Sequence, residues 1–220
     1  MFHLGSIRRT SIDVDLSFLI LIVFFVTMNY DQSRGAQYAL LWAPVLFISV
    51  LVHELAHAAT IGLLGFGSSH VVLGGMGGVT INERRARPWQ DFLISAAGPL
   101  SSFGLSFLCG LIAMKVPIRD LFFANLLNYL IAANFFWGIF NSLPVSPLDG
   151  GHAVRHLLRM FLSERTAFVI AVWIAIIAGG ATVIYCVRTG SFFIALFVAW
   201  FVWQNFQAWQ YFRDHGIPGD

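Results

Sequence analysis

Charged residues are scarce in this chain of 220 residues: they make up 11% of it, whereas hydrophobic residues make up 58%. A soluble domain has about 25% charged and about 45–50% apolar residues. The shortage of charge excludes an ordinary soluble domain, and the abundance of apolar residues excludes a disordered chain. The apolar residues form long runs that contain almost no charge, which indicates a protein that crosses a membrane several times.

Two further shortages narrow the range of functions. The net charge is only +2, from 13 Lys and Arg against 11 Asp and Glu, and this excess is too small to indicate a nucleic-acid partner. The chain has only two cysteines, Cys109 and Cys186, and both fall inside apolar runs. They are more typical of small core or lipid-facing residues than of a disulfide, and two cysteines give no metal-finger spacing.

The apolar runs number six, and a membrane-spanning helix needs about 20 apolar residues. We therefore predict an all-α polytopic membrane protein with about six transmembrane helices, forming a single domain over residues 1–220. The short first run is interpreted as a retained span, because no cleavage site typical of a signal peptide follows it. The runs cover residues 16–28, 38–64, 92–114, 121–143, 167–187 and 192–209.

Basic residues are divided unequally between the two sides that six spans would create. The side of both chain ends has more of them, so the positive-inside rule predicts that both termini lie in the cytoplasm. The lack of a transit peptide makes a prokaryotic plasma membrane the expected location. The larger group is Arg8, Arg9, Arg84, Arg85, Arg87, Arg155, Arg159, Arg165 and Arg213, and the smaller is Arg34, Lys115, Arg119 and Arg188.

A glycine-rich segment, Gly65–Ile81, separates the second run from the third. Apolar β-branched residues flank the turn sequence Gly74-Gly-Met-Gly-Gly78. This pattern predicts a short β-hairpin between the second and third helices, although a flexible loop fits the pattern equally well.

The second run contains the sequence His53-Glu-Leu-Ala-His57. Positions i and i+4 lie on one face of a helix, so the two imidazoles can bind one Zn²⁺ together. Glu54 lies beside the first ligand and can act as a general base toward water. Ionisable residues inside a spanning helix cost about 2.5–3.5 kcal/mol each. Local hydrogen bonds can satisfy one core histidine, but a bound cation in a watery cavity accounts for all three residues.

A third protein ligand is expected, because a catalytic zinc site has three of them and one water molecule. The best candidate is Asp149, within Pro144–Gly151, because that segment follows the fourth run and reaches the same side of the bilayer as His57. Considered alone, Asp149 is better explained as the N-cap of a helix. The main rival ligand is His152, which forms a second i, i+4 pair with His156 on a basic interfacial helix.

Together these motifs resemble the site-2 protease family of intramembrane zinc metalloproteases. The resemblance is carried by His53–His57 and by Asn141–Gly150, which has the pattern Asn-x-x-Pro-x-x-Pro-Leu-Asp-Gly. Three more segments are similar to other parts of the family pattern, so that nearly the whole chain is covered. These segments are Ser11–Phe18, Gly74–Gly78 and Ser95–Leu100.

The resemblance implies a zinc metalloendopeptidase that hydrolyses a peptide bond in a membrane-spanning protein near the cytoplasmic face. His53, His57 and Asp149 would bind one Zn²⁺ per chain. Glu54 would be the general base and acid, and Asn141 would help to hold the substrate or its oxyanion. The chain has no PDZ or nucleotide-sensing module, which implies a compact member of the family and a regulatory partner in the lipid bilayer.

Two other functions stay open on the residues alone. Intramembrane histidines and carboxylates also mark ion paths, so a metal transporter fits the motif. A proteolytically inactive, metal-binding membrane scaffold fits it as well. Glu54 favours the protease, because a transporter needs no base beside its ligands. In a protease, the predicted hairpin would pair with an unwound substrate strand.

Overall fold

The computed structural model of the chain describes residues 1–33, 35–81 and 86–216. The chain forms two compact units, one of residues 1–85 and 97–139 and the other of residues 86–96 and 140–220. Three of the basic residues used to predict the orientation lie outside the described residues, namely Arg34, Arg84 and Arg85.

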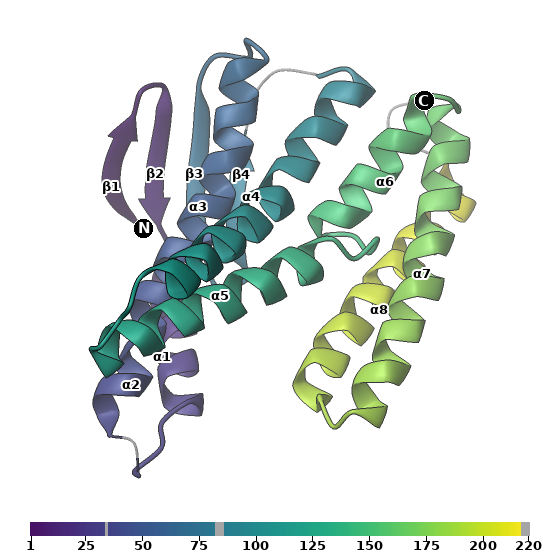
Figure 1. Ribbon diagram of the computed structural model, residues 1–220. Coiled ribbons are helices and arrows are strands. Elements are labelled where there is room, and N and C mark those ends of the chain that lie inside the picture. Colours follow the sequence, from purple (N-terminus) through teal and green to yellow (C-terminus); the bar gives the residue numbers. More distant parts are fainter. Residues whose placement is uncertain (34, 82–85, 217–220) are drawn as a thin grey trace. The chain divides into compact units, whose positions relative to one another are not determined.

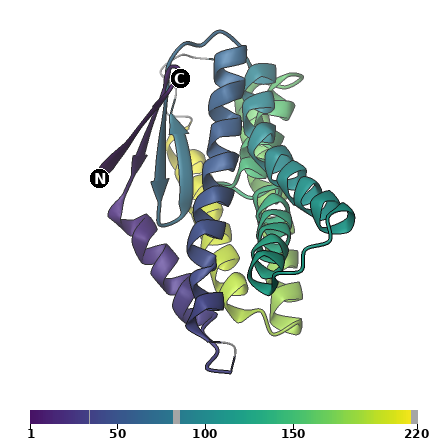
Figure 2. The ribbon, with the colours of Figure 1, turned by 60° about the vertical axis from the view of Figure 1, so that its left-hand side comes forward.

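The first unit contains a sheet of four strands (Figures 1 and 2). Strand β1 (Phe2–Ile7) pairs antiparallel with β2 (Thr10–Val14), which runs parallel to β3 (Ser69–Gly74). Strand β3 pairs antiparallel with β4 (Gly77–Ile81), which forms one edge of the sheet. The sequence patterns do not predict β1. They also do not predict the pairing of β2 with β3, because a parallel pair has no tight turn that would mark it locally.

Five helices belong wholly or partly to the first unit: α1 (Leu16–Met28), α2 (Ala36–Leu40), α3 (Trp42–Leu63), α4 (Pro88–Lys115) and α5 (Leu121–Asn141). The side chain of Asp15 caps α1 by accepting a hydrogen bond from the backbone nitrogen of Ser17 at 2.9 Å. The buried core joins the sheet to α1 and α3, which holds the middle of α3 against β3. Its residues are Ile12, Val14, Phe18, Val50, Ala58, Val71 and Leu73.

The second unit contains α6 (Asp149–Arg159), α7 (Glu164–Arg188) and α8 (Phe192–His215). Helices α7 and α8 lie side by side (Figure 1). Their buried residues Ala175 and Phe201 form a core with Val145 and Leu148, which precede α6. The turn that leads into α6 is therefore anchored by apolar side chains.

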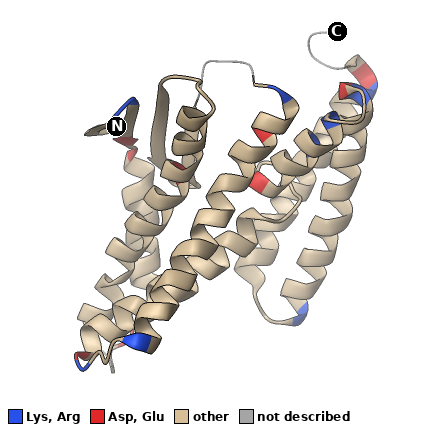
Figure 3. Ribbon diagram, turned by 45° about the horizontal axis from the view of Figure 1, so that its top comes forward, with Lys and Arg blue, Asp and Glu red and all other residues tan. Residues whose placement is uncertain are grey.

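Five segments of the described chain are long and apolar enough to cross a membrane, and the protein is an integral membrane protein. Figure 3 shows long uncharged stretches along the helices, with most charged residues near the helix ends. Helix α1 has 13 residues, or about 20 Å at about 1.5 Å per residue, which is shorter than a hydrocarbon core of about 30 Å. A sixth span therefore stays a prediction. The five segments are Ala36–Leu63, Pro88–Lys115, Leu121–Asn141, Glu164–Arg188 and Phe192–His215.

Candidate metal centre

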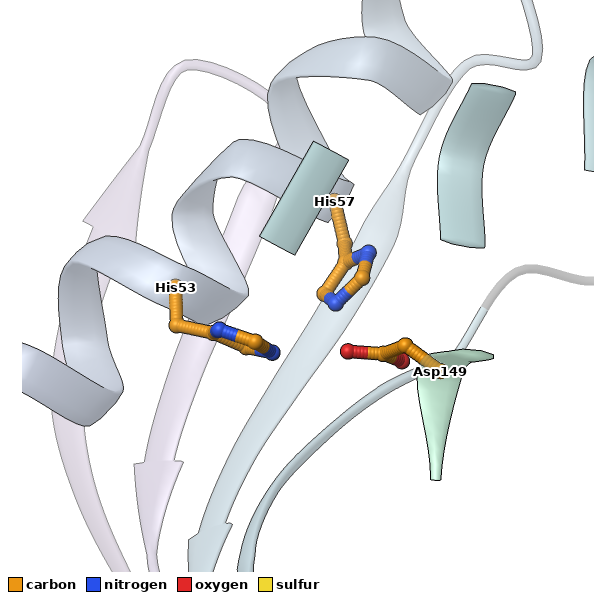
Figure 4. A group of neighbouring side chains, drawn as sticks. All are labelled: His53, His57 and Asp149. Atoms are coloured by element: carbon orange, nitrogen blue, oxygen red, sulfur yellow. The ribbon is translucent and has the colours of Figure 1, made fainter. Parts of the chain in front are cut away.

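Helix α3 carries His53, Glu54 and His57, and each of these side chains is at most 4% exposed. The two imidazoles project from neighbouring turns of the helix (Figure 4). Their ring centroids lie 5.0 Å apart, with the rings inclined at 75°. The i, i+4 spacing thus brings two ring nitrogens to one side of a buried helix.

Gly98 of α4 leaves the space beside the two imidazoles open. A Cβ atom at this position would overlap the Nε2 atoms of both His53 and His57. Nδ1 of His53 lies 3.0 Å from the hydroxyl of Ser102, which is fully buried. Because the hydroxyl engages Nδ1, Nε2 is the nitrogen of His53 that a metal can use.

The carboxylate of Glu54 faces strand β4. The hydroxyl of Thr80 donates a hydrogen bond to Oε2 of Glu54 at 2.7 Å, and it lies 3.2 Å from the backbone oxygen of the same residue. Sequence reasoning missed the contacts of both Thr80 and Ser102. No signal in the sequence identifies them, because a single hydroxyl residue has no characteristic spacing from the group that it contacts.

Trp137 of α5 packs on one side of the imidazole pair. Its ring centroid lies 6.4 Å from that of His53, with the rings nearly perpendicular at 78°. A Cβ atom at Gly77, where φ is +115°, would overlap the same indole ring. The glycine-rich turn therefore packs against Trp137, which in turn packs against His53.

Asp149 belongs to the second unit and is the first residue of α6. The N-cap of this helix is Leu148, so Asp149 does not occupy the cap position that its surrounding sequence favours. Val145 is fully buried in the core of this unit. The side-chain nitrogen of Asn205 donates a hydrogen bond of 2.6 Å to the backbone oxygen of Ser146. Side chains of α7 and α8 thus hold the turn that precedes Asp149.

Two glycines allow the start of α6 to approach that turn closely. A Cβ atom at Gly150 would overlap the backbone oxygens of Ser142 and Leu143, and one at Gly151 would overlap the backbone of residues 145–146. The Gly-Gly pair after Asp149 is therefore required by main-chain packing.

Within the described residues, His53, His57 and Asp149 form a group that can hold a metal ion. Each offers one ligand atom, and these atoms lie within 4.8 Å of one another (Figure 4). Two imidazole nitrogens and one carboxylate oxygen suit Zn²⁺ and leave a fourth position for water or substrate. The space kept open by Gly98 also fits an ion next to the two Nε2 atoms.

Two other residues that the sequence singles out lie outside this group. His152 is an exposed residue of α6, and its ring stacks on His156 with the centroids 6.4 Å apart. Asn141 is the last residue of α5 and is partly buried.

Two protein-family models match the chain. The one described as Peptidase M50B-like matches residues 17–143, which include both histidines of α3. The one described as Peptidase family M50 matches residues 117–184, which include Asp149.

Curated proteins from several organisms are similar to the chain. A protein of Synechocystis, named as a candidate zinc metalloprotease, is 28% identical over 84% of this chain and 53% of its own length. Rip3 of Mycobacterium tuberculosis, also named as a candidate zinc metalloprotease, is 33% identical over 70% of this chain and 43% of its own length. The chain thus spans about half the length of the curated relatives that it matches.

The fold is similar to that of a solved site-2 protease from Methanocaldococcus jannaschii. The TM-score is 0.64, and the match covers 94% of each chain at 22% sequence identity. At this level of identity, the similarity establishes the fold.

Proposed function

Because the chain belongs to the Peptidase M50B-like family, we propose that it is an intramembrane zinc metalloprotease that hydrolyses a peptide bond in a membrane-spanning protein. The observation that carries the proposal is the position of Glu54. Glu54 lies between the two histidines in the sequence, and its side chain is buried on a helix that is long enough to cross a membrane. A site that only binds metal needs no such base, whereas hydrolysis does. The names of the curated relatives support the same activity.

We propose that His53, His57 and Asp149 hold one Zn²⁺ per chain. The mutual proximity of their ligand atoms supports this set, as does the match between the donor atoms and the preference of zinc. When bound, zinc would lower the pKa of a water molecule toward about 7 and polarise the substrate carbonyl.

Glu54 would perform the proton transfers of the hydrolysis. It would accept a proton from the attacking water as the new C–O bond forms, and it would deliver that proton to the nitrogen as the C–N bond breaks. Its burial favours this role, because few bulk water molecules compete for the carboxylate. Asn141, at the end of α5, would help to hold the substrate or its oxyanion.

The edge strand β4 would bind the substrate. A membrane-spanning substrate must unwind before its peptide bond can be attacked, and an unwound strand can pair with the edge of a sheet. Val79→Pro is therefore expected to reduce cleavage and to leave the zinc content intact, because proline disturbs strand pairing. Unchanged turnover would exclude this mode of binding.

The proposed location is a prokaryotic plasma membrane, with both termini in the cytoplasm and cleavage near the cytoplasmic face. The excess of arginines on the side of the chain ends supports this orientation. Helix α1 would be the sixth span of a single metalloprotease domain. A regulatory membrane partner would control access of the substrate.

Glu54→Gln tests the activity. In proteoliposomes that contain a tagged membrane-spanning substrate, we expect cleavage to fall by about 10²–10⁴-fold, because a general base is lost. The zinc content should not change. Zinc flux across the vesicle membrane that persists in the variant, without cleavage by the wild type, would indicate a transporter.

A pair of variants tests the third ligand. Asp149→Asn is expected to lower the zinc content of the purified protein, whereas His152→Ala is expected to leave it unchanged, and elemental analysis measures both. The opposite result would assign the third ligand to His152.

A further inference from the structure

Strand β4 contacts the general base through Thr80. The Thr80 hydroxyl lies 2.7 Å from Oε2 of Glu54, the usual separation for a hydrogen bond from a hydroxyl to an oxygen acceptor. The hydroxyl donates and the carboxylate accepts, so the bond is strengthened by the charge of Glu54. The backbone oxygen of Glu54 is more distant from the same hydroxyl, at 3.2 Å, and a hydroxyl has one proton to donate.

The position of Thr80 is determined by the sheet. Thr80 lies opposite Val71 of β3, and Val71 is fully buried in the core that includes Val50 and Ala58 of α3. A β-branched side chain such as threonine also has few rotamers available. The Thr80 hydroxyl is therefore held at a fixed distance from the helix that carries Glu54.

Gly78 restricts the Glu54 side chain from the same strand. A Cβ atom at Gly78 would overlap Cδ and Oε1 of Glu54, so the backbone of β4 passes directly against the carboxylate. Residues 78 and 80 share one face of the strand, whereas Val79 and Ile81 on the opposite face are more than half exposed. One face of β4 thus confines the carboxylate on two sides.

We propose that Thr80 is a positioning residue for Glu54. Its hydroxyl holds Oε2 and thereby orients the carboxylate, so that Oε1 is the oxygen that accepts the proton from water and returns it to the leaving nitrogen. Without the hydroxyl, the carboxylate turns away from this orientation for part of the time, and a misplacement of about 1 Å can cost about 10²-fold in rate. The proposal rests on the proposed protease function.

Thr80→Val removes the hydroxyl while it conserves shape, and Thr80→Ser restores the hydroxyl. The matched control is Thr60→Val, because the Thr60 hydroxyl donates to the backbone oxygen of Ala56 on the same helix at 2.8 Å. For cleavage of a tagged membrane-spanning substrate, we expect kcat of Thr80→Val to fall by about 10–100-fold, with KM within about twofold of wild type. The serine variant and the control should keep kcat near the wild-type value, and all variants should keep their zinc.

Infrared difference spectroscopy on the zinc-free protein detects the hydrogen bond between Thr80 and Glu54 and does not require catalytic activity. The carboxylate band of Glu54 is identified as the band that Glu54→Gln removes. We expect this band to shift in Thr80→Val but not in Thr80→Ser or Thr60→Val. In the Glu54→Gln background, Thr80→Val should cause no further loss of residual activity, because the group that it positions is gone.

Wild-type kcat in folded, zinc-loaded Thr80→Val would overturn the proposal, and so would an equal loss in Thr80→Ser or an unshifted carboxylate band. If Thr80→Val does not accumulate in the membrane, Thr80→Ala replaces it with the same expected outcomes. If the zinc-loaded wild type cleaves no substrate, the proposed function fails instead, and the infrared comparison still decides whether Thr80 holds Glu54.

Discussion

The two units hold their candidate ligands in different ways. On α3 of the first unit, side chains and a glycine surround His53 and His57: the Ser102 hydroxyl contacts one ring, and Gly98 leaves space for both. In the second unit, Asp149 begins a short helix whose approach to the preceding turn is set by backbone contacts at Gly150. The difference shows that ligands can be oriented by neighbouring side chains or by the path of the main chain.

The largest effect on the first unit is expected from a substitution at Gly98. In Gly98→Ala, the new methyl group would occupy the space beside both Nε2 atoms. We therefore expect zinc affinity to fall by more than about 100-fold, which is the upper range for loss of a group that hydrogen-bonds to a metal ligand. Competition with a chelator measures the affinity. Gly104→Ala is the control in the same helix, because a Cβ there meets no atom within 4 Å. Equal zinc affinity in both variants would contradict the structure around the imidazoles.

In the second unit, the corresponding substitution should damage the fold as well as the site. In Gly150→Ala, the methyl group would overlap two backbone oxygens, and such overpacking costs about 1–3 kcal/mol. We expect a lower thermal unfolding temperature together with a lower zinc content. Gly180→Ala in α7 is the control, because a Cβ there has open space. If Gly150→Ala is less stable but keeps its zinc, the main chain at Gly150 does not position Asp149.

Acid should affect the two units in different pH ranges. Burial lowers the pKa of His156 in α6 from 6.5 to about 4, and the nearby positive charges of His152, Arg159 and Arg155 lower it further, against the opposing charge of Glu164. Between these two pH values the unfolded chain binds a proton that the folded chain does not, so the free energy of unfolding falls as the pH is lowered through this window. We expect a loss of about 1–2 kcal/mol, allowing for the partial exposure of the ring.

In the first unit, the contribution of Asp13 to the free energy of unfolding should be lost only at lower pH. Hydrogen bonds from His3 and His70 lower the pKa of Asp13 below its usual 3.8, so the stability that Asp13 contributes is lost as the pH falls below that value. Thermal unfolding between pH 7 and pH 3 tests both windows. His156→Gln should remove the dependence between pH 6.5 and about 4, and an unchanged pH profile in this variant would contradict the assignment.

A smaller loss of zinc affinity than in Gly98→Ala is expected at Ser102. Ser102→Ala removes the hydroxyl that contacts Nδ1 of His53, and the loss of such an outer-shell partner weakens metal affinity by about 10-fold or more. Ser101→Ala is the control, because the Ser101 hydroxyl donates its hydrogen bond to the backbone oxygen of Gly98. Identical zinc affinity in the two variants would show that Ser102 does not orient His53.

Local sequence patterns predict the elements of this protein better than their contacts. The run at residues 16–28 predicts the bounds of α1, and the spacing of His53 and His57 predicts that both imidazoles share a helix face. The glycine-rich segment fits a hairpin and a flexible loop equally well, and β3 and β4 pair antiparallel there. Strand β1 gives no comparable signal, because exposed and buried residues do not alternate along it.

The amino-acid sequence by itself determined that the chain is a membrane protein with two histidines and a carboxylate on one helix, since hydropathy and helical periodicity act within single segments. Which side chains form hydrogen bonds with those groups depends on the tertiary structure. Ser102 reaches His53 from another helix, and Thr80 reaches Glu54 from a strand at the edge of the sheet. A hydrogen bond requires two atoms about 3 Å apart, and for residues distant in sequence this separation depends on the packing of the whole unit.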